Sequence, residues 1–140
     1  MNRKYICCLL LFIIFCFPAV AGAEPNVRAA AAVLMEKENG QILQAKNIHS
    51  RLPPASLTKI LTAIVALEVG NLKDTVVISG RAAGQEGSSI WLAEGEKLEL
   101  EDLLYGLLLA SGNDAAVAIA EHIAGSVEEF ARIMTEKAEK

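Results

Sequence analysis

A serine and a lysine, one helical turn apart, are the first residues of this sequence that suggest chemistry. Ser56 and Lys59 lie at the start of an apolar stretch that predicts a helix over residues 56–69. Their spacing places both side chains on one face, and the helix dipole favours negative charge near the serine. A serine beside an amine that accepts its proton is an activated nucleophile. The alternative is that Ser56 is an ordinary N-cap.

The predicted helix is apolar on nearly every side. Such a helix normally lies inside a protein, so we expect it to be buried on all faces. Lysines are seldom buried without a partner, which makes Lys59 unusual there. A lysine is protonated at neutral pH unless burial and a nearby positive charge favour the neutral amine. Lys59 therefore needs both conditions to act as a base.

A second candidate motif, Ser111-Gly112-Asn113, lies between two segments that predict helices over residues 101–110 and 114–124. In a catalytic interpretation, the Ser111 hydroxyl relays a proton to the leaving group. The Asn113 amide then holds the substrate backbone and the amine of Lys59. In a structural interpretation, Gly112 ends one helix and Asn113 caps the next. Neither motif decides the matter separately, but the two together favour catalysis.

Residues 1–23 have the pattern of a secretory signal peptide. Arg3 and Lys4 precede an apolar stretch over residues 6–20, and Ala21-Gly22-Ala23 matches a cleavage site. The stretch is shorter than the roughly 20 residues of a membrane span and contains Pro18, which favours cleavage over a retained anchor. We therefore predict export, with residues 24–140 as the mature chain.

The predicted mature chain lacks residues that several function classes require. All three cysteines, Cys7, Cys8 and Cys16, lie in the signal segment. None therefore remains for a disulfide, a metal or a nucleophile. His49 and His122 stand alone, which argues against a zinc site. Acidic residues outnumber basic ones by 17 to 13 over the whole sequence, which argues against a nucleic-acid partner.

The remaining pattern predicts an α+β domain. Apolar segments at residues 31–35 and 41–45 flank Glu38-Asn39-Gly40, and the Asn-Gly pair is a strong hairpin signal. Short strands are expected at residues 75–79 and 97–100. Ser126-Val127-Glu128-Glu129 resembles a capping box that opens a last helix. A hairpin followed mostly by helices fits the α+β class.

Two segments resemble motifs of the low-molecular-mass penicillin-binding proteins, the serine D-alanyl-D-alanine carboxypeptidases of peptidase family S11. Residues 53–59, followed by Leu61-Thr62-Ala63, resemble the first motif, and residues 107–116 resemble the second. Gly112 in place of Asp is similar to the carboxypeptidase branch rather than to class A β-lactamases. The resemblance covers nearly all of residues 24–140, including Ser89-Ile90-Trp91. It implies a β-lactamase/D,D-transpeptidase-like domain, with an antiparallel sheet and a helical cluster, incomplete at the C-terminus.

The resemblance also implies a mechanism. Ser56 attacks the bond between two D-alanines at the end of a peptidoglycan stem peptide, and an acyl-enzyme forms as terminal D-alanine leaves. Lys59 is the base, Ser111 carries a proton, Asn113 positions the substrate, and the Ser56 N–H forms half of an oxyanion hole. β-Lactam antibiotics acylate the same serine, and no metal or organic cofactor is implied. The expected location is the periplasmic or extracellular face of the cytoplasmic membrane.

The family's third motif, Lys-Thr-Gly, does not occur in the sequence. In the family it lies on a later strand, where it supplies the other oxyanion donor and a positive charge near the base. The helical pattern from Ser126 also runs to the last residue with no Gly or Pro to end it. We therefore expect a truncated domain, and a 140-residue chain that is inactive or nearly so. Membrane association is expected only through C-terminal parts that the sequence lacks.

Three alternatives remain open. The first is another acyl-serine enzyme of the same fold, either a β-lactamase or a D,D-endopeptidase. The second is a secreted wall-binding scaffold without catalysis, although Ser56, Lys59, Ser111 and Asn113 are all present. The third is a helical interaction domain whose caps mimic both motifs.

Overall fold

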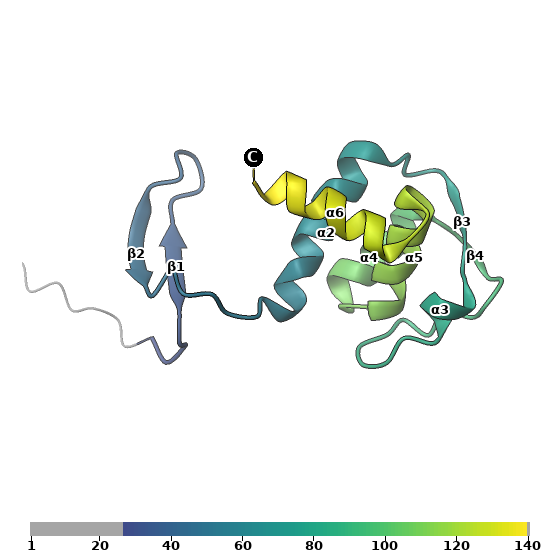
Figure 1. The fold of residues 1–140 in the computed structure, drawn as a ribbon, viewed down its shortest axis with the longest axis horizontal. Helices are drawn as coiled ribbons and strands as arrows, with labels where there is room; N and C mark the ends of the chain where they lie inside the picture. Colours follow the sequence, from purple (N-terminus) through teal and green to yellow (C-terminus); the bar gives the residue numbers. More distant parts are fainter. Residues whose placement is uncertain (1–26, 140) are drawn as a thin grey trace, which may run out of the picture. The chain divides into compact units, whose positions relative to one another are not determined.

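The structure is a computed structural model that describes residues 27–139 (Figure 1). The predicted signal peptide, residues 1–23, lies outside the described residues. The chain divides into two compact units, Met1–Arg51 and Leu52–Lys140. None of the helices within residues 27–139 is long and apolar enough to cross a bilayer.

The first unit contains the predicted hairpin. Strand β1 (Ala32–Met35) pairs antiparallel with β2 (Ile42–Lys46), with an irregular register between Leu34 and Met35. Gly40 has a φ of +73°, the left-handed conformation that glycine adopts without strain. The Glu36 carboxylate accepts hydrogen bonds from two backbone N–H groups of the turn, at 2.8 and 2.9 Å. The hairpin prediction is confirmed.

The second unit is mostly helical. A short 3-10 helix, η1 (Ala55–Leu57), leads into α2 (Thr58–Val69). Strands β3 (Thr75–Val77) and β4 (Lys97–Glu99) pair antiparallel, and α3 (Gly80–Ala83) lies between them in sequence. Helices α4 (Leu100–Leu109), α5 (Asn113–Ala124) and α6 (Val127–Ala138) follow. The α+β prediction is confirmed. Helix α3 was not expected, and the helix predicted from Ser56 begins at Thr58, after η1.

Local sequence explains two of the helix starts. The Ser79 hydroxyl accepts a hydrogen bond from Ala82 N at 3.0 Å and so caps α3. Ser126 caps α6 in the same way, with Glu129 N at 3.1 Å. This bond is the Ser126 half of the predicted capping box. The Glu129 carboxylate instead accepts hydrogen bonds from Arg132.

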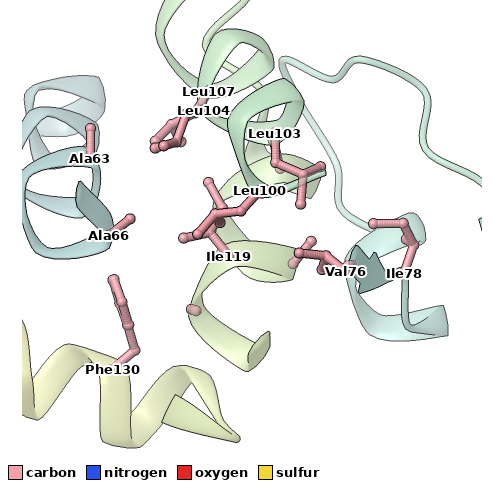
Figure 2. Close-up of a cluster of buried hydrophobic side chains, with 14 of the residues drawn as sticks. Ala63, Ala66, Val76, Ile78, Leu100, Leu103, Leu104, Leu107, Ile119 and Phe130 are labelled. Carbon is pink, nitrogen blue, oxygen red and sulfur yellow. The ribbon is translucent and has the colours of Figure 1, made fainter. Parts of the chain in front are cut away.

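Helix α5 is central to the second unit, because it packs against α2, α4, α6, α3 and β3 (Figure 1). Its buried residue Ile119 lies among side chains from the neighbouring elements (Figure 2). Helix α4 contributes leucines at helical spacing, all of them buried: Leu100, Leu103, Leu104 and Leu107. Phe130 of α6 and Val76 of β3 complete the core around Ile119.

One expectation about α2 is wrong for the part of the chain that the structure describes. Its buried residues, Thr62, Ala63, Val65 and Ala66, face the other helices. Ile60, Ile64 and Leu67 remain 53%, 39% and 57% exposed. Apolar composition shows that a side chain avoids water, but it does not identify the element that covers it. Helices α4, α5 and α6 bury only part of the circumference of α2.

Candidate active site

Ser56 lies in η1, at the entrance to α2. Its side chain is exposed, and the preceding residue, Ala55, has a φ of +47°. A non-glycine residue in this region of backbone space is strained, and such strain is often found at functional sites. The N–H groups in the first turn of a helix have no partner within that helix. The expected role of the Ser56 N–H as an oxyanion donor stays a prediction.

Lys59 lies one turn later, in the first turn of α2, and is half-buried. Its amine donates hydrogen bonds to Ser111 Oγ at 3.0 Å and to Asn113 Oδ1 at 2.7 Å. A third, short hydrogen bond goes to the backbone carbonyl oxygen of Ser111. An ammonium group has three N–H donors, and here three acceptors face it. The predicted meeting of Lys59 with the Ser111-Gly112-Asn113 bend is present in the structure.

Ser111 connects the nucleophile candidate to the amine. Its hydroxyl lies 3.2 Å from Ser56 Oγ and 3.0 Å from Lys59 Nζ. Among the hydrogen bonds of residues 27–139, none joins Lys59 to Ser56 directly. Ser111 is held in this position by a left-handed backbone with a φ of +57°. The geometry therefore forms a path from Ser56 through Ser111 to Lys59.

The bend does not follow the structural interpretation of the motif. Helix α4 ends at Leu109, and the left-handed residue after it is Ser111 rather than Gly112. Helix α5 starts at Asn113 without a side-chain cap. The Asn113 amide instead faces Lys59 through Oδ1 and donates from Nδ2 to Glu86 O at 2.6 Å.

Sequence reasoning missed the segment that supports Asn113. Glu86 O accepts from the side chain of Asn113, and Ser88 O accepts from its backbone N at 2.7 Å. Gly87, between them, has a φ of +90°, and a Cβ there would lie 2.9 Å from Asn113 Nδ2. A glycine beside serines in a region without periodicity was a weak signal for this contact.

A cavity of about 350 Å³ adjoins the serine. It is lined by Pro54, Ala55, Ser56, Leu57, Lys59, Ile60, Leu107, Leu108 and Ser111. All of these residues belong to the second unit. Of the lining residues that the structure describes, Lys59 is the one that carries a charge. Within residues 27–139, no group of three or more His, Cys, Asp or Glu side chains is placed to hold a metal ion.

Asp114 is fully buried beside this site. Burial raises the pKa of its carboxyl, but hydrogen bonds from Ser89, Leu92, Ile90 and Ala115 together lower that pKa below the ordinary value. A carboxyl whose pKa is lower in the folded state stabilises the protein above its unfolded-state pKa. This stabilisation is lost as the pH falls through the folded-state pKa.

We therefore expect Ser89→Ala to lose less stability than the native protein when the pH is lowered. The substitution removes one hydrogen bond to the Asp114 carboxylate, and this brings the pKa of Asp114 closer to its unfolded value. Urea unfolding between about pH 6 and pH 2 measures this dependence. Ser88→Ala is the matched control, because Ser88 is exposed and its hydroxyl is not bonded to Asp114. If the native protein, Ser89→Ala and Ser88→Ala all lose the same stability on acidification, the prediction is contradicted.

Comparison with known proteins identifies the chain. Residues 19–140 match the family model of the peptidase S11 D-alanyl-D-alanine carboxypeptidases. The chain is 46% identical over 117 residues to D-alanyl-D-alanine carboxypeptidase DacF of Bacillus subtilis, covering 80% of this chain and 30% of that protein. It is 41% identical over 127 residues to DacD of Escherichia coli, covering 83% and 33%.

A solved D-alanyl-D-alanine carboxypeptidase from Mycobacterium tuberculosis is similar, with a TM-score of 0.79 and 33% identity. The match covers 84% of this chain and 45% of that structure. The chain thus spans about a third of the length of the curated relatives described above. The resemblance seen in the two sequence motifs is confirmed: the chain belongs to the peptidase S11 family of D-alanyl-D-alanine carboxypeptidases.

Proposed function

We propose that Ser56 is the nucleophile of a D-alanyl-D-alanine carboxypeptidase that shortens peptidoglycan stem peptides. The observation that carries the proposal is the path of hydrogen-bonding groups from Ser56 Oγ to Ser111 Oγ and on to Lys59 Nζ. Two strained residues, Ala55 and Ser111, hold the two hydroxyls 3.2 Å apart. Family membership supports the proposed reaction class, and the geometry supports the proposed roles.

In the proposed acylation, Ser56 Oγ bonds to the carbonyl carbon of the penultimate D-alanine. The serine proton passes to Ser111 Oγ, while the Ser111 proton passes to a neutral Lys59 amine. The backbone N–H of Ser56 donates to the developing oxyanion. The proton then returns through Ser111 to the nitrogen of terminal D-alanine as its C–N bond breaks. In a second step, the oxygen of a water molecule bonds to the acyl carbon while Lys59 takes a proton from that water. The bond to Ser56 Oγ then breaks, the shortened peptide leaves as a carboxylic acid, and the proton returns from Lys59 through Ser111 to Ser56 Oγ.

Lys59 limits this mechanism in the chain as it stands. It faces three acceptors, which match the three N–H groups of an ammonium, and a base must first lose one of these protons. A nearby positive charge favours the neutral amine, but among the described residues Lys59 is the one charged residue that lines the cavity beside Ser56. We therefore propose that the 140-residue chain alone has little or no activity.

The biological setting is part of the proposal. The sequence pattern of residues 1–23 supports export, and residues 24–140 then form part of a catalytic domain on the outer face of the cytoplasmic membrane. The substrate is a stem peptide ending in D-Ala-D-Ala, and β-lactams are acylating inhibitors. One solved relative, from Haemophilus influenzae, is named penicillin binding protein 5, and this chain is 37% identical to it.

A chimera tests the proposal, because the chain spans only 30% of DacF. Residues 27–139 replace the matching segment of the Bacillus subtilis protein, and the unmodified DacF is the positive control. We expect the chimera to release D-alanine from a stem peptide and to react with labelled penicillin, whereas the 140-residue chain does not label stoichiometrically. Cleavage of cross-linked dimers without D-alanine release would indicate an endopeptidase instead.

Ser56→Ala in the chimera is expected to abolish both reactions. A folded chimera that releases no D-alanine and binds no penicillin would contradict the proposed function. Stoichiometric labelling of the 140-residue chain would contradict the proposed inactivity and leave the reaction class intact.

A further inference from the structure

Asp114 directly follows Asn113 in the sequence, but its carboxylate makes a separate set of contacts. The side chain is 0% exposed. Its Oδ2 accepts hydrogen bonds from Ser89 Oγ at 2.6 Å, Ile90 N at 3.1 Å and Leu92 N at 3.1 Å. Its Oδ1 accepts from Ala115 N at 2.9 Å. Through these hydrogen bonds, the carboxylate binds the segment over residues 89–92 to the N-terminus of α5.

The residues just before this segment, 86–88, contact Asn113. Ser88 O and Glu86 O accept hydrogen bonds from the backbone N and the side-chain Nδ2 of Asn113, at 2.7 and 2.6 Å. Two adjacent residues of α5 thus bind consecutive parts of one loop, with Asp114 at residues 89–92 and Asn113 at residues 86–88. Because the loop is short between these attachments, a loss of the Asp114 contacts moves the carbonyl groups that face Asn113.

The loop also sets which end of the Asn113 amide faces the lysine. With Nδ2 donating to Glu86 O, Oδ1 points at Lys59 Nζ, 2.7 Å away. A flipped amide would place the Nδ2 donors against the donors of Lys59 and the Oδ1 acceptor against the Glu86 carbonyl oxygen, so both contacts would be lost. The orientation of the amide therefore depends on the position of Glu86.

We propose that Asp114 is a positioning residue of the site: through the loop over residues 86–92, its buried carboxylate fixes the orientation of the Asn113 amide and thereby one hydrogen bond of Lys59. The contribution of this positioning role to catalysis rests on the proposed acyl transfer. Asp114 itself does not contact Ser56, Lys59 or Ser111 through any hydrogen bond of the described residues.

The first test uses the full chain, solubilised with a mild detergent, and needs no activity. Asp114→Asn has nearly the same shape, but its amide places a donor opposite the N–H groups of Ile90 and Leu92. With ¹⁵N-asparagine labelling, we expect the native protein to show a nuclear Overhauser effect between Asn113 Nδ2–H and Gly87 Hα, because a Cβ at Gly87 would lie only 2.9 Å from Asn113 Nδ2. Asp114→Asn should lose this signal.

Trace acetylation mapped by mass spectrometry supplies the second readout. Lys37, whose side chain is 93% exposed, is the internal reference. Loss of one charge-assisted hydrogen bond is expected to raise the acetylation rate of Lys59 relative to Lys37 by about tenfold. Asp102→Asn is the matched control, because Asp102 lies in the first turn of α4 and is exposed. It should change neither readout.

Ser89→Ala covers the case in which Asp114→Asn does not fold. It keeps the carboxylate and removes one of its partners, so a smaller change in the same direction is expected. The inference is overturned if a folded Asp114→Asn protein keeps both the native Overhauser signal and the native acetylation rate of Lys59. If Asp114→Asn does not fold, the same result in Ser89→Ala overturns it.

Penicillin labelling of the DacF chimera separates this inference from the proposed function. If the chimera with Asp114 does not label, the proposed function fails while the two structural readouts still decide the positioning role. If that chimera labels and its Asp114→Asn form labels equally fast, the positioning role in acylation is wrong and the proposed function stands.

Discussion

Replacing Lys59 with methionine is expected to slow acylation of Ser56 in the DacF chimera by roughly 10²- to 10⁴-fold, the usual contribution of a general base. Methionine has a similar length, but it can neither accept the proton relayed through Ser111 nor hold Asn113 Oδ1. The measurement is the rate constant for covalent labelling by penicillin. Lys37→Met, in the hairpin turn, is the control and should label at the native rate.

Lys59→Arg separates a base from a fixed positive charge. Arginine keeps the charge but cannot be deprotonated in a protein, so it should be about as slow as Lys59→Met if Lys59 is the base. Labelling near the native rate in Lys59→Arg would contradict the role of Lys59 as a base. Native labelling in Lys59→Met would contradict any role of its amine.

Leu103→Ala is expected to lower the free energy of unfolding by about 2–5 kcal/mol, because it opens a cavity in the core. Leu103 is 0% exposed and lies in the core of the helical unit (Figure 2). Domains of this size are often only about 5–15 kcal/mol stable, so the loss is a large fraction of the total. Urea unfolding of the full chain, followed by circular dichroism, measures the change.

Leu109→Ala is the matched control on the same helix. Leu109 is 83% exposed and occupies the last position of α4. Removal of an exposed side chain usually changes stability by no more than about 0.5 kcal/mol. Similar losses in the two variants would show that the packing around Leu103 is not as described.

Periodicity in the sequence predicted most of the fold. The leucines of α4 recur at helical spacing, and the Asn39-Gly40 pair marked the hairpin. Helix α3 was missed because it spans only Gly80–Ala83 and is too short to show a period. The environment of α2 was predicted wrongly for the described residues, since apolar composition carries no information about which elements pack on each face.

The residues of the candidate site could be predicted from the sequence, but the hydrogen bonds that join them could not. Helical spacing placed Ser56 beside Lys59. Their link to Ser111 and Asn113, more than 50 residues away, came from the catalytic interpretation of the second motif and from the resemblance to known motifs, not from spacing. Contacts between distant segments depend on the tertiary fold, which single-sequence patterns do not specify. The backbone strain at Ser111 and the support of Asn113 by Glu86 became visible only in the structure.

Peptide mapping of penicillin-labelled chimera tests the central claim most directly. Trypsin cleavage after Arg51 and Lys59 places Ser56 in a peptide over residues 52–59, whereas Ser111 lies in a separate peptide after Lys97. We predict one adduct of penicillin mass, on Ser56 in the first peptide, and none in the Ser56→Ala protein. An adduct on Ser111, or a labelled Ser56→Ala protein, would contradict the assignment of Ser56 as the nucleophile.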